Sequence, residues 1–230
     1  MAHDPQHRNE TRRRVAIAAA ALPIVAVGLL NALYLPHLAD TPIAYWSADI
    51  AQWLVLSALC LYALARYGAV APREYGLRAP SPDFPARHML GASVLASLVL
   101  AAAYFGTTAL AERWLPATPP AFSYSGLVPS GAMRVPVVIY FAVTAGFVEE
   151  VVYRALPLTA LGSAQRLRGA SGAYVLVTAL LFASIHWEGG PAQLAPAFVA
   201  GVVAALLYLR IGNLWPLVVA HTVVNLIDFW

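Results

Sequence analysis

The sequence has no lysine, and its single cysteine, Cys60, lies within an apolar run. A lone cysteine excludes a disulfide within the chain and leaves nothing that resembles a cysteine-based metal site. Charged residues are scarce as well: they make up 11% of the 230 residues, whereas a soluble domain averages about 25%. Because 60% of the residues are hydrophobic, the composition is not that of an ordinary soluble domain.

Long apolar runs recur along most of the chain. About 20 mostly apolar residues are enough to cross the hydrocarbon core of a bilayer as a helix. We therefore predict an all-α fold, a polytopic transmembrane helical bundle of about seven spans. The predicted spans are 15–35, 50–65, 89–111, 135–161, 173–187, 191–209 and 214–229.

The domain organisation follows from these spans. Residues 1–14 are polar and form a predicted N-terminal tail without regular structure, and residues 15–134 hold the N-terminal spans and loops. Residues 36–49, which contain two prolines and several polar side chains, are predicted to be one of those loops. Residues 135–230 form the predicted C-terminal core, made of the last four spans.

The arginines predict the orientation of the bundle. Most lie before the first predicted span or in the loops after the second, fourth and sixth, whereas only Arg113 and Arg134 lie in the opposite set of loops. The positive-inside rule then places the N-terminus in the cytoplasm. Because these arginines occupy short loops between spans, the net charge of +3 does not predict a nucleic-acid partner.

Ionisable side chains inside the spans are the candidates for function, because each costs about 2.5–3.5 kcal/mol near the bilayer centre on insertion scales. Structural pairing between helices is the alternative reading for each of them. Together with the polar amide of Asn225, they gather in three of the last four spans: Glu149, Glu150, Arg154, His186, His221, Asn225 and Asp228.

Helical spacing separates the two adjacent glutamates. Glu150 and Arg154 are four residues apart and therefore share a helix face, which favours a structural ion pair. Glu149 lies about 100° around the helix, on the face of Tyr153. A carboxylate without a strong counter-charge in an apolar site has a raised pKa, which suits a general base.

His221 and Asn225 also share a helix face, and with Glu149 and His186 they bring a carboxylate, two imidazoles and an amide from three helices. Such groups can activate water and stabilise an oxyanion. Glu149, His186 and His221 could equally form a zinc site, although the sequence contains no HExxH pattern. Phe182, four residues before His186, is interpreted as a packing residue.

Three short patterns in this order resemble the CPBP family of intramembrane proteases, which includes the CAAX prenyl endopeptidases and bacteriocin-processing proteins. They are EEVVYR at residues 149–154, FASIH at 182–186 and HTVVN at 221–225. The resemblance covers about residues 135–228. It implies a glutamate-dependent endopeptidase in which Glu149 activates water with help from His186, while His221 and Asn225 stabilise the oxyanion and Glu150 and Arg154 support the site.

The resemblance further implies a membrane-anchored protein or peptide substrate, and we expect an integral protein of a bacterial inner membrane. No cofactor is expected, with zinc left open because the family was long described as metalloproteases. Two alternatives are a non-catalytic immunity or scaffold protein of the same fold and a proton-coupled transporter. The intact motifs argue against the first, and the lack of an internal repeat argues against the second.

Overall fold

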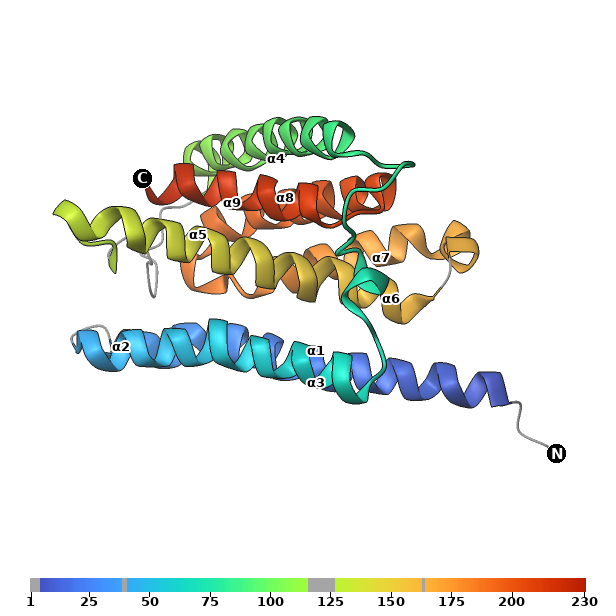
Figure 1. The fold of residues 1–230 in the computed structure, drawn as a ribbon. Coiled ribbons are helices and arrows are strands. Elements are labelled where there is room, and N and C mark those ends of the chain that lie inside the picture. The colour runs from blue at the N-terminus through green and yellow to red at the C-terminus, as the bar shows by residue number, and fades with distance from the viewer. Residues whose placement is uncertain (1–4, 39–40, 116–126, 163) are drawn as a thin grey trace.

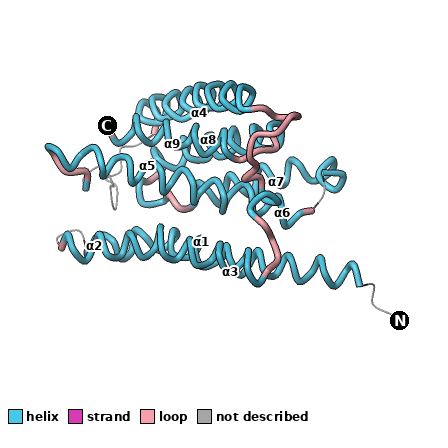
Figure 2. Tube along the Cα trace, viewed as in Figure 1, coloured by secondary structure: helices cyan, strands magenta, loops and turns pink. Residues whose placement is uncertain are grey.

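The computed structural model describes residues 5–38, 41–115, 127–162 and 164–230. These residues form helices joined by short loops, and no strand occurs among them (Figure 2). The predicted all-α fold is therefore confirmed. Figure 1 shows the helices lying side by side in layers, with the N-terminus and the C-terminus at opposite ends of the molecule.

The first layer is a pair of long helical segments. Helix α1 spans Pro5–Leu38, and α2 (Pro42–Asp49) continues through a π-helical stretch, η1 (Ile50–Leu56), into α3 (Ser57–Tyr67). The prediction that residues 36–49 form a loop is wrong for most of this segment. Pro42 stands in the first turn of α2, where its missing N–H costs no helical hydrogen bond.

Burial explains why the rest of that segment is helical. The side chains of Leu35 and Tyr45 pack with Val137 and Phe141 of the next layer, so helical structure here buries apolar surface. At the other end, α1 begins at Pro5, well inside the stretch that was predicted to lack regular structure.

The second part of the molecule is a bundle of helices. Helix α4 spans Ala86–Trp114 and packs against α8 (Pro191–Ile211) and α9 (Trp215–Phe229). Helix α5 (Arg134–Glu150) packs against α9, and α7 (Ala164–Ser184) packs against α8. Helix α6 (Leu156–Leu161) joins the end of α5 to α7 through a short turn (Figure 1).

Two glycines let the helices of this bundle approach closely. A Cβ atom on Gly146 of α5 would lie 2.9 Å from the backbone nitrogen of Thr222 on α9. A Cβ atom on Gly201 of α8 would lie 2.9 Å from the Cα atom of Ala179 on α7. Small residues at such crossings are typical of helices that pack inside membranes.

The helices account for all seven predicted spans. Among the described residues, five helical segments are long and apolar enough to cross a membrane: 9–31, 43–67, 86–114, 131–161 and 191–211. Two shorter apolar helices, 171–184 and 215–229, match the remaining predicted spans. The chain is an integral membrane protein, and the second span is longer than predicted because α2 extends it.

Candidate active site

One cavity of about 420 Å³ lies among the helices of both parts of the molecule. Glu149, His186, His221 and Asn225, the candidate catalytic residues, all line it. Side chains from three segments that are distant in the sequence thus meet at one cavity, whereas the catalytic role of each stays a prediction.

The walls of the cavity extend beyond the last four spans, the region that the sequence pointed to, because N-terminal helices contribute as well. Asn31 of α1, Asp49 of α2 and Trp53 of η1 form part of the wall. Helix α4 adds Tyr104 and Glu112. The N-terminal helices had no recognisable motif, and Asp49 escaped notice because residues 36–49 were assigned to a loop.

Glu149 and Glu150 end helix α5, and the next turn is π-helical (η5, Val151–Ala155). In this turn the backbone N–H of Leu156 bonds to the carbonyl of Val151, five residues earlier. Pro157 offers a reason, because a proline clashes with the carbonyl four residues before it in a regular α-helix. Wide turns of this kind are frequent at functional sites.

The expected pair of Glu150 and Arg154 forms at the floor of the cavity. Arg154 Nε lies 3.5 Å from Glu150 Oε2, and both side chains are about 1% exposed. The guanidinium carbon of Arg154 also lies 4.0 Å from the centroid of the Phe182 ring, a cation–π contact. Phe182 is thus more than a packing residue, because its ring faces the buried charge.

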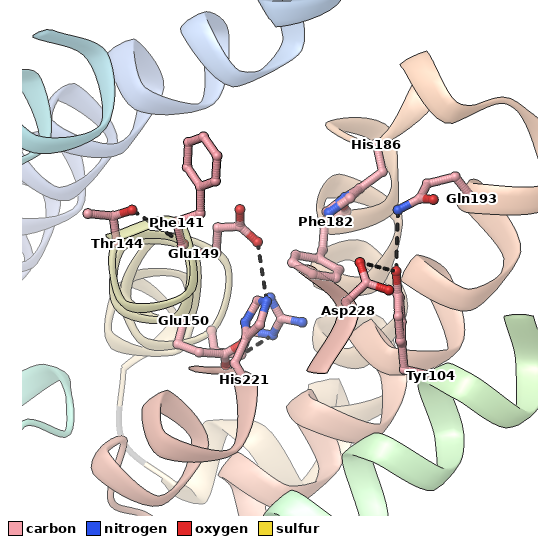
Figure 3. A network of polar contacts seen from close by, with 11 residues as sticks. Tyr104, Phe141, Thr144, Glu149, Glu150, Phe182, His186, Gln193, His221 and Asp228 are labelled. Carbon is pink, nitrogen blue, oxygen red and sulfur yellow. Dashed lines mark hydrogen bonds and ion pairs between the residues drawn. The ribbon is translucent and has the colours of Figure 1, made fainter. Parts of the chain in front are cut away.

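The ring of His221 lies between the two glutamates (Figure 3). Its Nδ1 lies 2.9 Å from Glu150 Oε1, and its Nε2 lies 3.7 Å from Glu149 Oε2. Gly146 favours this contact, since it brings α5 against α9 at Thr222, the residue next to His221, about one turn before the two glutamates. Sequence spacing paired His221 only with Asn225, because a contact across 71 residues leaves no local pattern.

His186 follows the end of α7 instead of lying within it, as the predicted span 173–187 had placed it. The helix stops at Ser184, and His186 precedes a 3₁₀ turn, η6 (Trp187–Gly189). Its Nδ1 lies 2.9 Å from the carbonyl oxygen of Phe182. A carbonyl only accepts, so Nδ1 carries the hydrogen and Nε2 of the neutral ring is left as a base.

A second group of polar side chains lies across the cavity from Glu149 (Figure 3). Gln193 Nε2 donates to the Tyr104 hydroxyl at 3.4 Å, and that hydroxyl donates to Asp228 Oδ2 at 3.5 Å. Glu188 also lines the cavity, and burial raises the pKa of its carboxyl above the ordinary value. Of this group only Asp228 had been noted from the sequence.

Within the described residues, no group of three or more His, Cys, Asp or Glu side chains has the geometry of a metal site. Two members of the possible zinc set, Glu149 and His221, lie close together: His221 Nε2 is 3.7 Å from Glu149 Oε2. The other ring nitrogen of His221 already faces Glu150.

A comparison with known families finds a match in the C-terminal part of the chain. Residues 131–227 match the family model described as type II CAAX prenyl endopeptidase, Rce1-like. These residues form an Rce1-like domain. No curated protein and no solved structure matches the chain significantly.

The matched region contains all three motifs that carry the resemblance to the CPBP family, in keeping with a protease of the CAAX type. It leaves out several residues that line the same cavity. Asp49, Tyr104 and Glu112 precede it, and Asp228 follows it by one residue. The Rce1-like domain therefore forms only part of the cavity wall.

Proposed function

We propose that this protein is an intramembrane endopeptidase that hydrolyses a peptide bond near the membrane-associated end of a protein or peptide substrate. One observation carries the proposal. Glu149 is only 5% exposed, its Oε2 has no hydrogen-bond partner, and its side chain lines a cavity together with His186, His221 and Asn225. A buried carboxylate that faces space for a substrate fits a general base.

In the proposed reaction, Glu149 accepts a proton from a water molecule while the water oxygen attacks the carbonyl carbon of the scissile bond. His186 assists through Nε2, the ring nitrogen that does not face the Phe182 carbonyl. The carbon–oxygen bond forms, and the former carbonyl oxygen takes up the negative charge. Collapse of this intermediate breaks the carbon–nitrogen bond, and the proton held by Glu149 passes to the leaving amine.

The oxyanion is the proposed partner of His221 and Asn225. Asn225 donates from its amide, and His221 donates from Nε2 when its ring carries both hydrogens. Preorganised donors of this kind contribute about 2.7–4 kcal/mol each when measured by mutation. Glu150 holds the other ring nitrogen of His221 at 2.9 Å, so we assign Glu150 and its partner Arg154 to positioning.

The proposed setting is a bacterial inner membrane with the N-terminus in the cytoplasm. The distribution of the arginines supports this orientation. The substrate is then a membrane-anchored protein or peptide, whether prenylated or not, and no nucleic acid takes part.

A co-expression screen tests the proposal. Candidate membrane-anchored proteins are expressed with the wild-type chain and with Glu149→Gln, and cleavage is followed by immunoblot and mass spectrometry. We expect the substitution to reduce cleavage by about 10²–10⁴-fold, the usual contribution of general base catalysis, while the protein remains inserted and folded. Full turnover by Glu149→Gln would refute the assignment of the base.

A further inference from the structure

The cavity is strongly acidic although the chain as a whole carries a net charge of +3. The chain has 11 aspartates and glutamates, and six of them line this one cavity. They come from helices of both parts of the molecule: Asp49, Glu112, Glu149, Glu150, Glu188 and Asp228.

Few positive groups offset these carboxylates. Arg154 is the one arginine that lines the cavity among the described residues, and its side chain is already committed to Glu150 at 3.5 Å. His186 and His221 are charged only when protonated. An excess of carboxylates inside a membrane protein is costly unless a partner of opposite charge joins them.

Asp49 has no part in the proposed reaction. Its burial is also harder to explain by a structural role than that of the other carboxylates. It is 1% exposed and lies in a membrane-spanning helical segment, 43–67. Tyr140 donates to its Oδ2 at 2.8 Å, and Tyr45 is a second phenol beside the carboxylate. Its Oδ1 has no hydrogen-bond partner, although the side chain lines the cavity.

The carboxylates of the cavity differ in exposure. Glu112 and Asp228 are exposed, on α4 and α9, whereas Asp49 and Glu149 are buried. A positive group in this cavity therefore has carboxylates at its exposed rim as well as in its interior.

We infer that the cavity binds a cationic segment of its substrate, a lysine or arginine side chain beside the scissile bond, with Asp49 as the buried acceptor of its charge. This inference rests on the proposed function and names its substrate class.

Peptides that differ in one charge test the inference. Octanoyl-AAAXAAA-amide peptides with X as lysine, glutamine or glutamate are titrated into the purified full chain carrying Glu149→Gln, and binding is measured by calorimetry. We expect the lysine peptide to bind about tenfold more tightly than the glutamine peptide, equivalent to about 1.4 kcal/mol, and the glutamate peptide more weakly than both. Equal binding of all three peptides overturns the inference.

Variants then locate the acceptor. Adding Asp49→Asn should reduce the preference for lysine over glutamine to about twofold, because the amide keeps an acceptor for Tyr140 but loses the charge. Asp83→Asn, in an exposed loop, is the matched control and should leave the preference unchanged. If Asp49→Asn does not fold, Glu112→Gln at the exposed end should still lower the preference, and an unchanged preference there counts against the inference.

The two proposals fail in different ways. A preference for lysine in binding, with no cleavage of any membrane-anchored substrate by the wild-type chain, supports the cation site and refutes the endopeptidase. Cleavage that depends on Glu149 but ignores the charge of the peptide refutes the cation site and leaves the endopeptidase standing.

Discussion

Glu150 has two partners at once, Arg154 on the next turn and His221 on another helix. Glu150→Gln should therefore destabilise the protein, because it leaves the Arg154 guanidinium buried without its anion. Breaking one side of a buried pair costs about 3–5 kcal/mol. We expect a clear fall in Tm in detergent, together with reduced cleavage because His221 loses the carboxylate that orients it.

Glu10→Gln is the matched control for that experiment. Glu10 and Arg14 are also four residues apart, but both side chains are 51% exposed. An exposed pair contributes about 0–1 kcal/mol, so the Tm should hardly move. Equal effects of the two substitutions would contradict a structural role for the buried pair.

The second prediction at this scale concerns metal. We expect cleavage to survive exhaustive chelation and the purified protein to contain no stoichiometric zinc. The reason is that a carboxylate in an apolar cavity can serve as a base without a metal, and that the pairing of His221 with Asn225 suits an oxyanion better than a cation. Activity that disappears on chelation and returns with zinc would make His186 and His221 ligands and replace the proposed mechanism.

The candidate residues could be found from the sequence because each is an ionisable or amide side chain in an apolar run. Their partners could not, since the contact between Glu150 and His221 joins residues 71 positions apart. The place of Phe182 beneath the Arg154 guanidinium was missed for the same reason: an aromatic residue in an apolar helix carries no signal of what it faces.

At the scale of elements, the approach of α5 to α9 depends on Gly146. Gly146→Ala should push the helices apart, because the new Cβ would lie 2.5 Å from Thr222 Oγ1 and 2.9 Å from its backbone nitrogen. The displaced helices would separate the glutamates from His221. We expect a lower Tm and, at temperatures where the variant stays folded, a kcat reduced at least about tenfold, since small misplacements at a reacting centre can cost about 100-fold.

Gly106→Ala provides the comparison on α4. A Cβ atom there would have no neighbour within 4 Å, so the substitution adds helix propensity without a clash. Alanine is favoured over glycine in a helix by about 0.8–1.0 kcal/mol, so Tm should stay level or rise and cleavage should be unchanged. If Gly146→Ala behaves like Gly106→Ala, the close helix crossing does not position the site.

The ends of the helices could be predicted where apolar runs were long. The predictions were wrong where packing or a local change in helix type outweighed the sequence pattern. Residues 42–49 read as a loop because of their proline and polar side chains, but the burial of Tyr45 outweighs that pattern. The π-helical turn after Glu150 could not be predicted from the sequence, and the predicted pairing of Glu150 with Arg154 assumed regular α-helical spacing.

At the scale of the whole molecule, the exposed ends of the cavity predict the side on which it opens. Glu112 and Asp228 lie near the C-terminal ends of α4 and α9, at the end of the molecule opposite the N-terminus (Figure 1). If the arginines keep the N-terminus in the cytoplasm, the cavity opens away from the cytoplasm.

Cysteine labelling tests this orientation. In a Cys60→Ala background, Ser130→Cys should react with a membrane-impermeant maleimide in intact spheroplasts, whereas Ser81→Cys should react only after the membrane is permeabilised. Both serines are exposed, and they lie in loops at opposite ends of α4. The reverse pattern would show that the cavity faces the cytoplasm.

The cavity wall crosses the boundary of the Rce1-like domain, and this has a consequence for how such proteins diversify. The proposed reacting groups lie inside residues 131–227, while Asp49, Tyr104, Glu112 and Asp228 lie outside. Selectivity can therefore change through substitutions, or even through exchange of the N-terminal helices, without disturbing the hydrolytic groups. Two chains with the same C-terminal domain can inherit one reaction and still accept different substrates.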